Sequence, residues 1–510
     1  MSNQSVNNKR IVKNTLMLYI RMLFTMGVSL FTSRVILLAL GVEDYGIYSV
    51  VGGIVSMFTF LNGGMVSATQ RYLTFEIGQE NEERLSKVFS ISIQIHALIA
   101  FVVVLLSETV GLWFLYEKLV IPDNRMIAAF WVYQCSIVAC VVSIMSVPYN
   151  ADIIAHEKMS AFAYISVVEV TLKLLVVYLL YVSQWDKLVV YAVLLLLIQL
   201  LIRWIYARYC GKHFSESHYH HYIDKSLFKE MFSFAGWSFW GNLAYVLYTQ
   251  GVNMMLNIFG GPIVNAARGI AVQVQGTVAQ FVTNFQMAIN PQITKSYASA
   301  NLKQMHTLMF RSARYSFFLL FFLTLPILFE TEYILILWLR TPPPEAVVFT
   351  QWMIVISLIY TIANPCVIAN QATGKVKIYQ MVVGGILLLI LPLSYIALKL
   401  GLPAYSVFIV HFCIECIAQF SRMYMLRELI HLPIRAYIQN VYLPIISVVV
   451  LSCILPYYVQ TQFEVGLLRL VIVTSIAILN SIVMVAFLGL TKGERSFCQN
   501  KILQVLKIKR

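Results

Sequence analysis

The sequence predicts an all-α polytopic membrane protein with 14 transmembrane helices. Of its 510 residues, 59% are hydrophobic and only 12% are charged, which is more apolar surface than a soluble protein of this length can bury. The apolar residues form runs long enough to cross a bilayer, for which about 20 residues suffice. The basic residues gather in every second connection between these runs. We expect two pseudo-symmetric six-helix bundles and two further helices.

The apolar runs set the order of the predicted spans. They cover residues 14–40, 47–70, 88–116, 126–150, 161–182, 188–208, 231–258, 262–290, 312–339, 347–371, 376–398, 402–424, 438–460 and 467–490. An even number of spans places both termini on one side of the membrane. One set of loops and ends holds 26 of the 37 Lys and Arg residues, and the other set holds six. Because basic loops stay in the cytoplasm, we expect both termini there.

An internal repeat predicts the division into lobes. Pro148 and Lys158 close the fourth span, and Pro365 and Lys375 close the tenth with the same spacing, 217 residues later. Gly41 after span one corresponds to Gly260 after span seven. Six spans separate the copies, so the repeat is parallel. We expect an N-terminal lobe (1–210), a cytoplasmic linker (211–229), a C-terminal lobe (230–430), two added helices (431–490) and a basic cytoplasmic tail (491–510).

Polar residues follow one side of the first span. At about 100° per residue, Asn14, Arg21, Thr25, Ser29 and Thr32 fall in one sector of roughly 80°. A cation in hydrocarbon costs at least about 3 kcal/mol, so it normally faces water, protein or an anion. We therefore expect this side of the helix to line a hydrated, electropositive cavity.

Spans seven and eight carry similar stripes. The members that we select as substrate-binding candidates are Asn242, Asn253, Asn257, Arg268 and Gln275. Guanidinium groups bind phosphate, and amides bind sugar hydroxyls, so the lining suits an anionic, hydroxyl-rich ligand. The alternative is that the stripes join helices, because polar side chains hydrogen-bond across membrane bundles. For Arg268, snorkelling to the outer surface competes with a cavity position.

Five other charged residues lie inside spans, and one of them is Arg203. Arg34 lies near the outer surface, where snorkelling is favoured, and is kept as a weaker binding candidate. Glu169 and Lys173 share one face of span five at i and i+4 and form either a structural ion pair or a site that couples transport to an ion. Glu415 has no charged neighbour one turn away, which leaves its partner open.

Two motifs are typical of metal sites but favour other roles. Cys413 and Cys416 have CxxC spacing without a second pair. His218, His220 and His221 lie in a polar stretch that does not predict an ordered element. We expect no metal and no cofactor, apart from a coupling H⁺ or Na⁺.

The topology and the residues that close the spans resemble a known family. Fourteen spans, two six-span bundles, the repeated Pro-to-Lys element and the segment Leu40–Tyr48 (LGVEDYGIY) are similar to the Wzx-type polysaccharide flippases. These are the O-antigen and capsule branch of the multidrug/oligosaccharidyl-lipid/polysaccharide (MOP) exporter superfamily.

The resemblance implies a transporter of the bacterial plasma membrane that moves undecaprenyl-pyrophosphate-linked oligosaccharide to the outer leaflet by alternating access. It implies partners among membrane lipids and the polysaccharide polymerase machinery, and possible counter-flow of H⁺ or Na⁺. The family's cationic cavity corresponds here to Arg21 and Arg268, with Arg34, Lys173 and Arg203 as further members.

Two other functions compete with lipid-linked glycan transport. A multidrug cation antiporter of the same superfamily uses acidic residues in its lobes, whereas span one here has none and embedded cations outnumber embedded acids five to two. A membrane glycosyltransferase or polymerase needs a sizeable external domain, and every predicted external loop is short. The sequence therefore favours a transporter over an enzyme, and nothing in it indicates a nucleic-acid partner.

Overall fold

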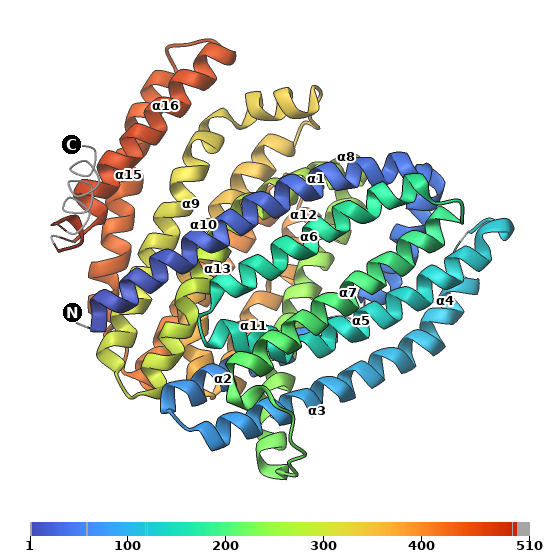
Figure 1. The fold of residues 1–510 in the computed structure, drawn as a ribbon. Coiled ribbons are helices and arrows are strands. Elements are labelled where there is room, and N and C mark those ends of the chain that lie inside the picture. The colour runs from blue at the N-terminus through green and yellow to red at the C-terminus, as the bar shows by residue number, and fades with distance from the viewer. Residues whose placement is uncertain (1–2, 58–59, 118, 120, 492, 497–510) are drawn as a thin grey trace, which may run out of the picture. The chain divides into compact units, whose positions relative to one another are not determined.

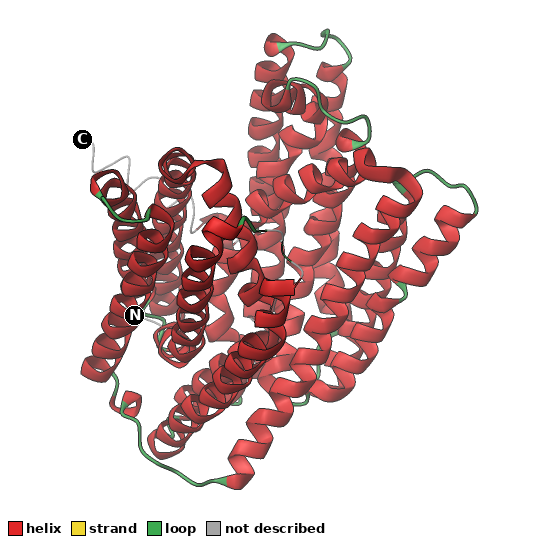
Figure 2. Ribbon diagram, turned by 90° about the vertical axis from the view of Figure 1, so that its right-hand side faces the viewer, coloured by secondary structure: helices red, strands yellow, loops and turns green. Residues whose placement is uncertain are grey.

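The structure is a computed structural model that describes residues 3–57, 60–117, 119, 121–491 and 493–496. Over these residues it consists of helices and short connections without a β-strand (Figure 2). This confirms the all-α class. Most of the predicted tail 491–510 lies outside the described residues.

The chain divides into two compact units. Unit 1 comprises Met1–Asn242 and Thr294–Ala300. Its helices appear in blue to green in Figure 1. They are α1 (Asn3–Met57), α2 (Phe60–Gln79), α3 (Glu82–Leu106), α4 (Leu112–Glu117), α5 (Met126–Ala155), α6 (Met159–Val182) and α7 (Lys187–His213). The two end segments of α8 (Lys225–Ala298), residues 225–242 and 294–298, also belong to this unit.

Unit 2 comprises Leu243–Ile293 and Asn301–Arg510. It contains the middle of α8, followed by α9 (Leu302–Leu339), α10 (Ala346–Thr373), α11 (Val376–Leu388), α12 (Ile390–Lys399), α13 (Ser406–Ile430), α14 (Ile434–Tyr437), α15 (Leu443–Gln460) and α16 (Leu467–Met484). Helices α15 and α16 lie side by side (Figure 1). The predicted division into lobes, linker and tail stays a prediction.

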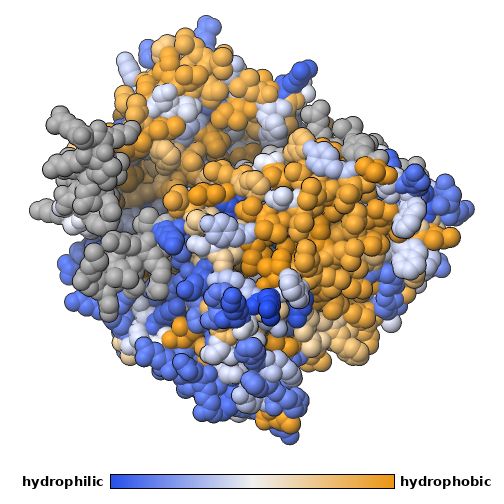
Figure 3. Space-filling view, in the orientation of Figure 1, coloured by the Kyte–Doolittle hydropathy of each residue, from blue (hydrophilic) through white to orange (hydrophobic). Residues whose placement is uncertain are grey.

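Ten helices of the described chain are long and apolar enough to cross a membrane. They correspond to predicted spans three to six and nine to fourteen. The other four predicted spans lie in α1, α2 and α8. Apolar side chains cover broad areas of the face in Figure 3, with hydrophilic residues grouped elsewhere on it. The fold is that of a multi-pass membrane protein, and the count of fourteen spans stays a prediction.

Two glycines interrupt the longest helices at equivalent points. Gly41 in α1 has φ +82°, and Gly261 in α8 has φ +74°. Both values lie in the region that glycine adopts at little cost. The sequence analysis matched Gly41 with Gly260, which is one residue before the glycine that breaks α8. Gly260 keeps helical geometry, and the chain turns at the next glycine, 220 residues after Gly41.

The repeat extends to helix ends that the sequence did not reveal. Glu157 after α5 and Gly374 after α10 both have positive φ, at +58° and +76°, and are 217 residues apart. Asn81 and Asn301 each cap the next helix by accepting a hydrogen bond from the backbone N–H three residues later, at 3.0 and 3.1 Å. A side-chain cap of this kind stabilises a helix by about 1 kcal/mol.

Three arginines that lie near span ends, and that the sequence count groups with the loops and ends, are in fact buried ion-pair partners in unit 2. Arg314 pairs with Glu494 at 2.6 Å, Arg422 with Glu415 at 2.6 Å, and Arg469 with Glu330 at 3.0 Å. A buried cation is tolerated when a carboxylate neutralises it. Since these side chains pack within the bundle, they carry less topological information than exposed loop cations.

Candidate functional site

A pocket in unit 2 forms where α8 folds back on itself. After the break at Gly261, the second limb of α8 returns beside the first, and Arg268 donates a hydrogen bond of 2.8 Å to the carbonyl of Thr249. Helices α10 and α13 complete the walls. The pocket has a volume of about 70 Å³, and its polar members include Tyr245, Thr249, Arg268, Gln275, Tyr360 and His411.

Two nitrogen atoms of this pocket are buried without a hydrogen-bond partner. They are Nε of Arg268 and Nε2 of His411. The His411 ring also packs edge-on against Tyr248, with centroids 5.3 Å apart. Among the described residues that line the pocket there is no aspartate or glutamate. A buried guanidinium N–H without an acceptor is costly, and an oxygen atom of a ligand could satisfy the Nε of Arg268.

Unit 1 holds the other predicted arginine. The Arg21 guanidinium lies over the Phe162 ring, 4.6 Å from its centroid, and its Nε is buried without a hydrogen-bond partner. Tyr206 on α7 and Glu169 on α6 are near enough to interact with it electrostatically. A cation over an aromatic face gains about 0.5–2 kcal/mol, which offsets only part of its desolvation.

Glu169 does not neutralise this region, because it pairs with Lys173. Their Oε1 and Nζ atoms are 2.6 Å apart. Arg21, Lys173 and Glu169 together carry one net positive charge. The i and i+4 spacing predicted this contact, and the structure shows both side chains partly accessible.

The predicted binding residues do not all gather at the pocket in unit 2. Arg268 and Gln275 line it, whereas Asn253 is half-buried and Asn257 is exposed, and neither is a lining residue. Asn242 is exposed and belongs to unit 1, where its Nδ2 would lie 3.1 Å from a Cβ atom on Gly63. The side chain of Arg34 lies outside the described part of the chain.

Some stripe residues join helices, as the alternative interpretation had it. Asn14 donates a 3.1 Å hydrogen bond to the carbonyl of Glu157 at the end of α5. Gln286 donates to Ser316 and to the carbonyl of Thr361, both at 3.1 Å. These amides therefore connect helices within a unit and are not available to a ligand.

Sequence reasoning missed the aromatic and histidine side of the pocket. Tyr360 and His411 lie in apolar spans with no polar stripe of their own, and Tyr245 lies in span seven but was not among the residues of its stripe. The available signal was a single histidine inside an apolar run. A lone histidine of this kind is usually packed in a core, and no pattern in the sequence groups it with Arg268.

Two other embedded charges have structural partners. Glu415, whose partner the sequence left open, bonds Arg422 two turns later in α13, and Arg422 also donates to the Tyr379 hydroxyl at 3.3 Å. Arg203 lies over the Tyr149 ring at 5.1 Å and donates to the carbonyl of Met145. Both arginines hold helices together, and Arg203 is not free to serve the cationic cavity.

Removal of one member of the Glu415–Arg422 pair should destabilise unit 2. Both side chains are at most 3% exposed, and an uncompensated buried charge costs about 3–5 kcal/mol. We expect Arg422→Met to lower the thermal unfolding midpoint of the detergent-purified protein strongly. The double variant Glu415→Met/Arg422→Met should recover most of this loss, because it leaves no buried charge. A double variant no more stable than Arg422→Met would contradict the prediction.

Comparison with known proteins shows the family of the chain. Residues 11–283, more than half of the chain, match the model of the family described as "Polysaccharide biosynthesis protein". The chain belongs to this family. The match confirms the resemblance to Wzx-type flippases stated from the sequence. No curated protein matches the sequence significantly.

The fold of this polysaccharide biosynthesis protein is similar to solved MOP-superfamily structures. An outward-facing multidrug resistance MATE family transporter has a TM-score of 0.72 and 13% identity, covering 83% of this chain and 96% of its own. A MATE structure in the bent conformation has a TM-score of 0.72 and 13% identity, covering 84% and 97%. A MOP superfamily transporter from Pyrococcus furiosus has a TM-score of 0.65 and 14% identity, covering 82% and 96%. These similarities show the fold.

Proposed function

We propose that this polysaccharide biosynthesis protein is a flippase for undecaprenyl-pyrophosphate-linked oligosaccharide. It would move the headgroup from the inner to the outer leaflet of the bacterial plasma membrane by alternating access, with both termini in the cytoplasm. The product would supply O-antigen or capsule assembly and its polymerase machinery. Family membership supports polysaccharide biosynthesis, and the pocket chemistry supports the charge of the substrate.

The observation that carries the proposal is the unpaired Arg268 Nε in a pocket without acidic lining residues. A guanidinium presents several N–H donors in a plane that matches phosphate oxygens. A hydrogen bond to a charged group contributes about 1.5–3 kcal/mol. Gln275 and the tyrosine hydroxyls add donors and acceptors suited to sugar hydroxyls. Arg21, whose charge the neighbouring Glu169–Lys173 pair does not neutralise, supplies a second cationic position in the other unit.

A multidrug antiporter is the second candidate, because the similar folds include multidrug resistance transporters. The fold alone does not decide between the two functions. The Pyrococcus furiosus transporter is described by the reverse polarity of its binding pocket, which suggests a different function for that protein. Pocket charge is therefore a sensible criterion within this fold, and a cationic drug would meet Arg268 here without an acid to pair with.

Coupling to protons is assigned to Glu169 as part of this proposal. Its carboxylate pairs with Lys173, and a proton bound to the carboxylate would break the pair. We expect Glu169→Gln to abolish stimulation of glycan-lipid translocation by an inward proton gradient in proteoliposomes, while gradient-free translocation persists. Lys173→Gln, which also breaks the pair, should leave a pH-dependent rate. Unchanged stimulation in Glu169→Gln would make the pair structural.

The function is tested by deletion of the gene in its host. Lipid-linked repeat units should accumulate in the inner leaflet, protected from an enzyme added outside the cells, and surface polysaccharide should disappear. The wild-type gene in trans should restore both. Normal surface polysaccharide in the deletion strain, together with sensitivity to cationic drugs, would favour the antiporter.

A further inference from the structure

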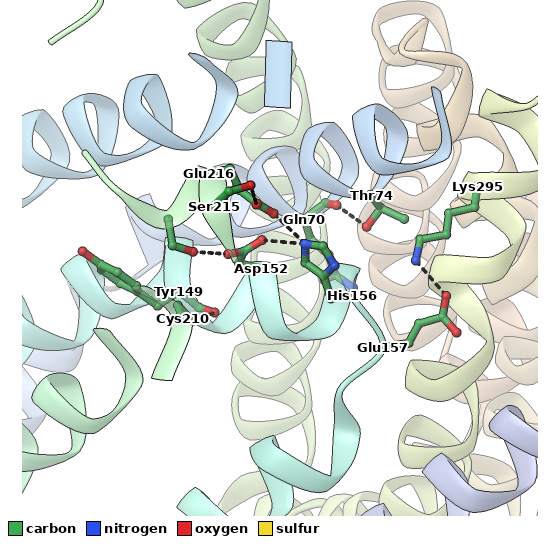
Figure 4. A network of polar contacts seen from close by, with 11 residues as sticks. Gln70, Thr74, Tyr149, Asp152, His156, Glu157, Cys210, Ser215, Glu216 and Lys295 are labelled. Carbon is green, nitrogen blue, oxygen red and sulfur yellow. Dashed lines mark hydrogen bonds and ion pairs between the residues drawn. The ribbon is translucent and has the colours of Figure 1, made fainter. Parts of the chain in front are cut away.

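Three metal-ligating side chains meet in unit 1. Asp152 and His156 lie one helical turn apart where α5 ends, and Glu216 lies in the 3-10 turn Ser215–Ser217 of the segment between α7 and α8. Figure 4 shows the three side chains directed toward one another. We call them the Asp152 cluster.

The distances within the cluster are short. His156 Nε2 is 2.5 Å from Glu216 Oε1 and 3.7 Å from Asp152 Oδ1. One ligand atom from each residue lies within 4.8 Å of the other two. The Cys210 thiol, in contrast, is directed to the carbonyl of Tyr149 at 3.5 Å (Figure 4). The cluster therefore presents one nitrogen and two oxygen ligands.

One carboxylate oxygen of the cluster accepts no hydrogen bond. Asp152 is 0% exposed, and its Oδ2 accepts a 2.5 Å hydrogen bond from the Ser217 hydroxyl. Its Oδ1 is buried without a hydrogen bond and faces His156. A buried carboxylate oxygen is costly unless a donor or a cation satisfies it. This atom is the observation that points to a ligand.

The two carboxylates of the cluster also interact with each other. Asp152 and Glu216 are both buried and hydrogen-bond each other, and in the described part of the chain their only ion-pair partner is His156. Without an ion, the two carboxylates must therefore share a proton. A divalent cation would balance both charges and leave the histidine neutral, as metal coordination requires.

The surroundings also meet the requirements of a metal site. Zinc–nitrogen and zinc–oxygen distances of about 2.0–2.2 Å place tetrahedral ligands roughly 3.4 Å apart. The separations of 2.5 Å between His156 and Glu216 and of 3.7 Å between His156 and Asp152 differ from this value by less than about 1 Å. The Phe214 ring stacks on the imidazole at 4.1 Å, and Ser217 orients Asp152. Such outer contacts fix metal ligands in place. The His156 side chain is one-quarter exposed, which gives an ion access from solvent.

We propose that Asp152, His156 and Glu216 bind a divalent transition-metal ion, with Zn²⁺ the best match to one imidazole and two carboxylates. The ion joins the end of α5 to the segment that leads from α7 into α8. The site lies in the repeated Pro-to-Lys element but only in its first copy, because Cys366–Lys375 offers no equivalent aspartate or histidine.

Metal binding to the purified full-length protein tests the proposal. After chelator treatment and dialysis against ZnCl₂, we expect about one Zn²⁺ per chain by elemental analysis. Asp152→Asn and His156→Ala should each weaken binding at least about 100-fold. Ser217→Ala keeps all three ligands and should weaken it roughly 10-fold, as loss of an outer contact does. Co²⁺ in place of Zn²⁺ should give visible absorption bands that His156→Ala removes.

The matched control uses the neighbouring histidines of the same segment. The triple variant His218→Ala/His220→Ala/His221→Ala removes three more exposed imidazoles and should keep full stoichiometry and affinity. Gel filtration and thermal unfolding identify any variant that fails to fold. If Asp152→Asn does not fold, the zinc affinity of Ser217→Ala still tests the proposal. The proposal is overturned if the wild-type protein holds no Zn²⁺, or if only the triple variant loses Zn²⁺. The Asp152 cluster would then be a contact in which the side chains share a proton.

Discussion

Arg268→Glu is expected to abolish translocation of the glycan lipid while the protein still inserts and accumulates. The variant places an acid in a pocket that has none and removes the guanidinium whose Nε is unpaired. Loss of one member of a buried charge pair costs about 2–5 kcal/mol, which is roughly 30-fold or more in binding of a pyrophosphate. Repulsion of the anion adds to this loss. Surface polysaccharide and translocation in proteoliposomes measure the effect.

Two controls separate binding from packing at Arg268. Arg268 also donates to Thr249 and so joins the two limbs of α8. Arg268→Lys keeps the charge but loses the planar donor set, and it should retain partial activity. Arg340→Glu reverses the charge of an exposed arginine in the same unit and should transport normally. Equal activity of Arg268→Glu and the wild type would remove Arg268 from the site.

Arg21→Glu should have the second-largest effect. The change converts a region of net positive charge into one with two carboxylates and a single lysine, Lys173. It also removes the cation–aromatic contact with Phe162. We expect surface polysaccharide to fall below about one-tenth of the wild-type amount, because each 1.4 kcal/mol lost is tenfold in affinity, at unchanged protein abundance in the membrane.

The structural part of this effect can be isolated. Phe162→Leu removes the aromatic ring and keeps the guanidinium, so it should cost stability, about 0.5–2 kcal/mol, but little transport. Arg208→Glu is a matched reversal at an exposed arginine of unit 1. Loss of transport in Phe162→Leu equal to that in Arg21→Glu would show that Arg21 serves packing, not the substrate.

The lengths of the apolar runs were sufficient to predict the fold class, because a helix must be long and apolar to cross a bilayer. Long apolar runs and the bias of basic residues between loops gave the all-α class, and ten of the predicted spans are recovered as helices. The repeat was visible through Pro148 and Pro365. Its other members, such as Asn81 and Asn301, were not visible. A helix cap needs only a single small polar residue, and a polar loop contains several such residues.

The candidate site was predicted only in part, for a physical reason. Charged residues in apolar spans stand out, so Arg21 and Arg268 could be found. Their partners could not, since contacts between helices join residues far apart in sequence. Glu415 met Arg422 two turns along its own helix, outside the i+4 reach that we considered. Glu216 reaches His156 across 60 residues, and no spacing rule connects them.

The most direct test compares two lipids in proteoliposomes that contain the purified protein. One carries an oligosaccharide on undecaprenyl pyrophosphate, and the other carries the same sugar on an uncharged link. We expect the protein to translocate the pyrophosphate lipid well above the protein-free background, to leave the uncharged lipid near that background, and to lose the difference in Arg268→Glu. Equal translocation of both lipids, or export of a cationic dye in place of either, would contradict a cationic site for an anionic glycan lipid.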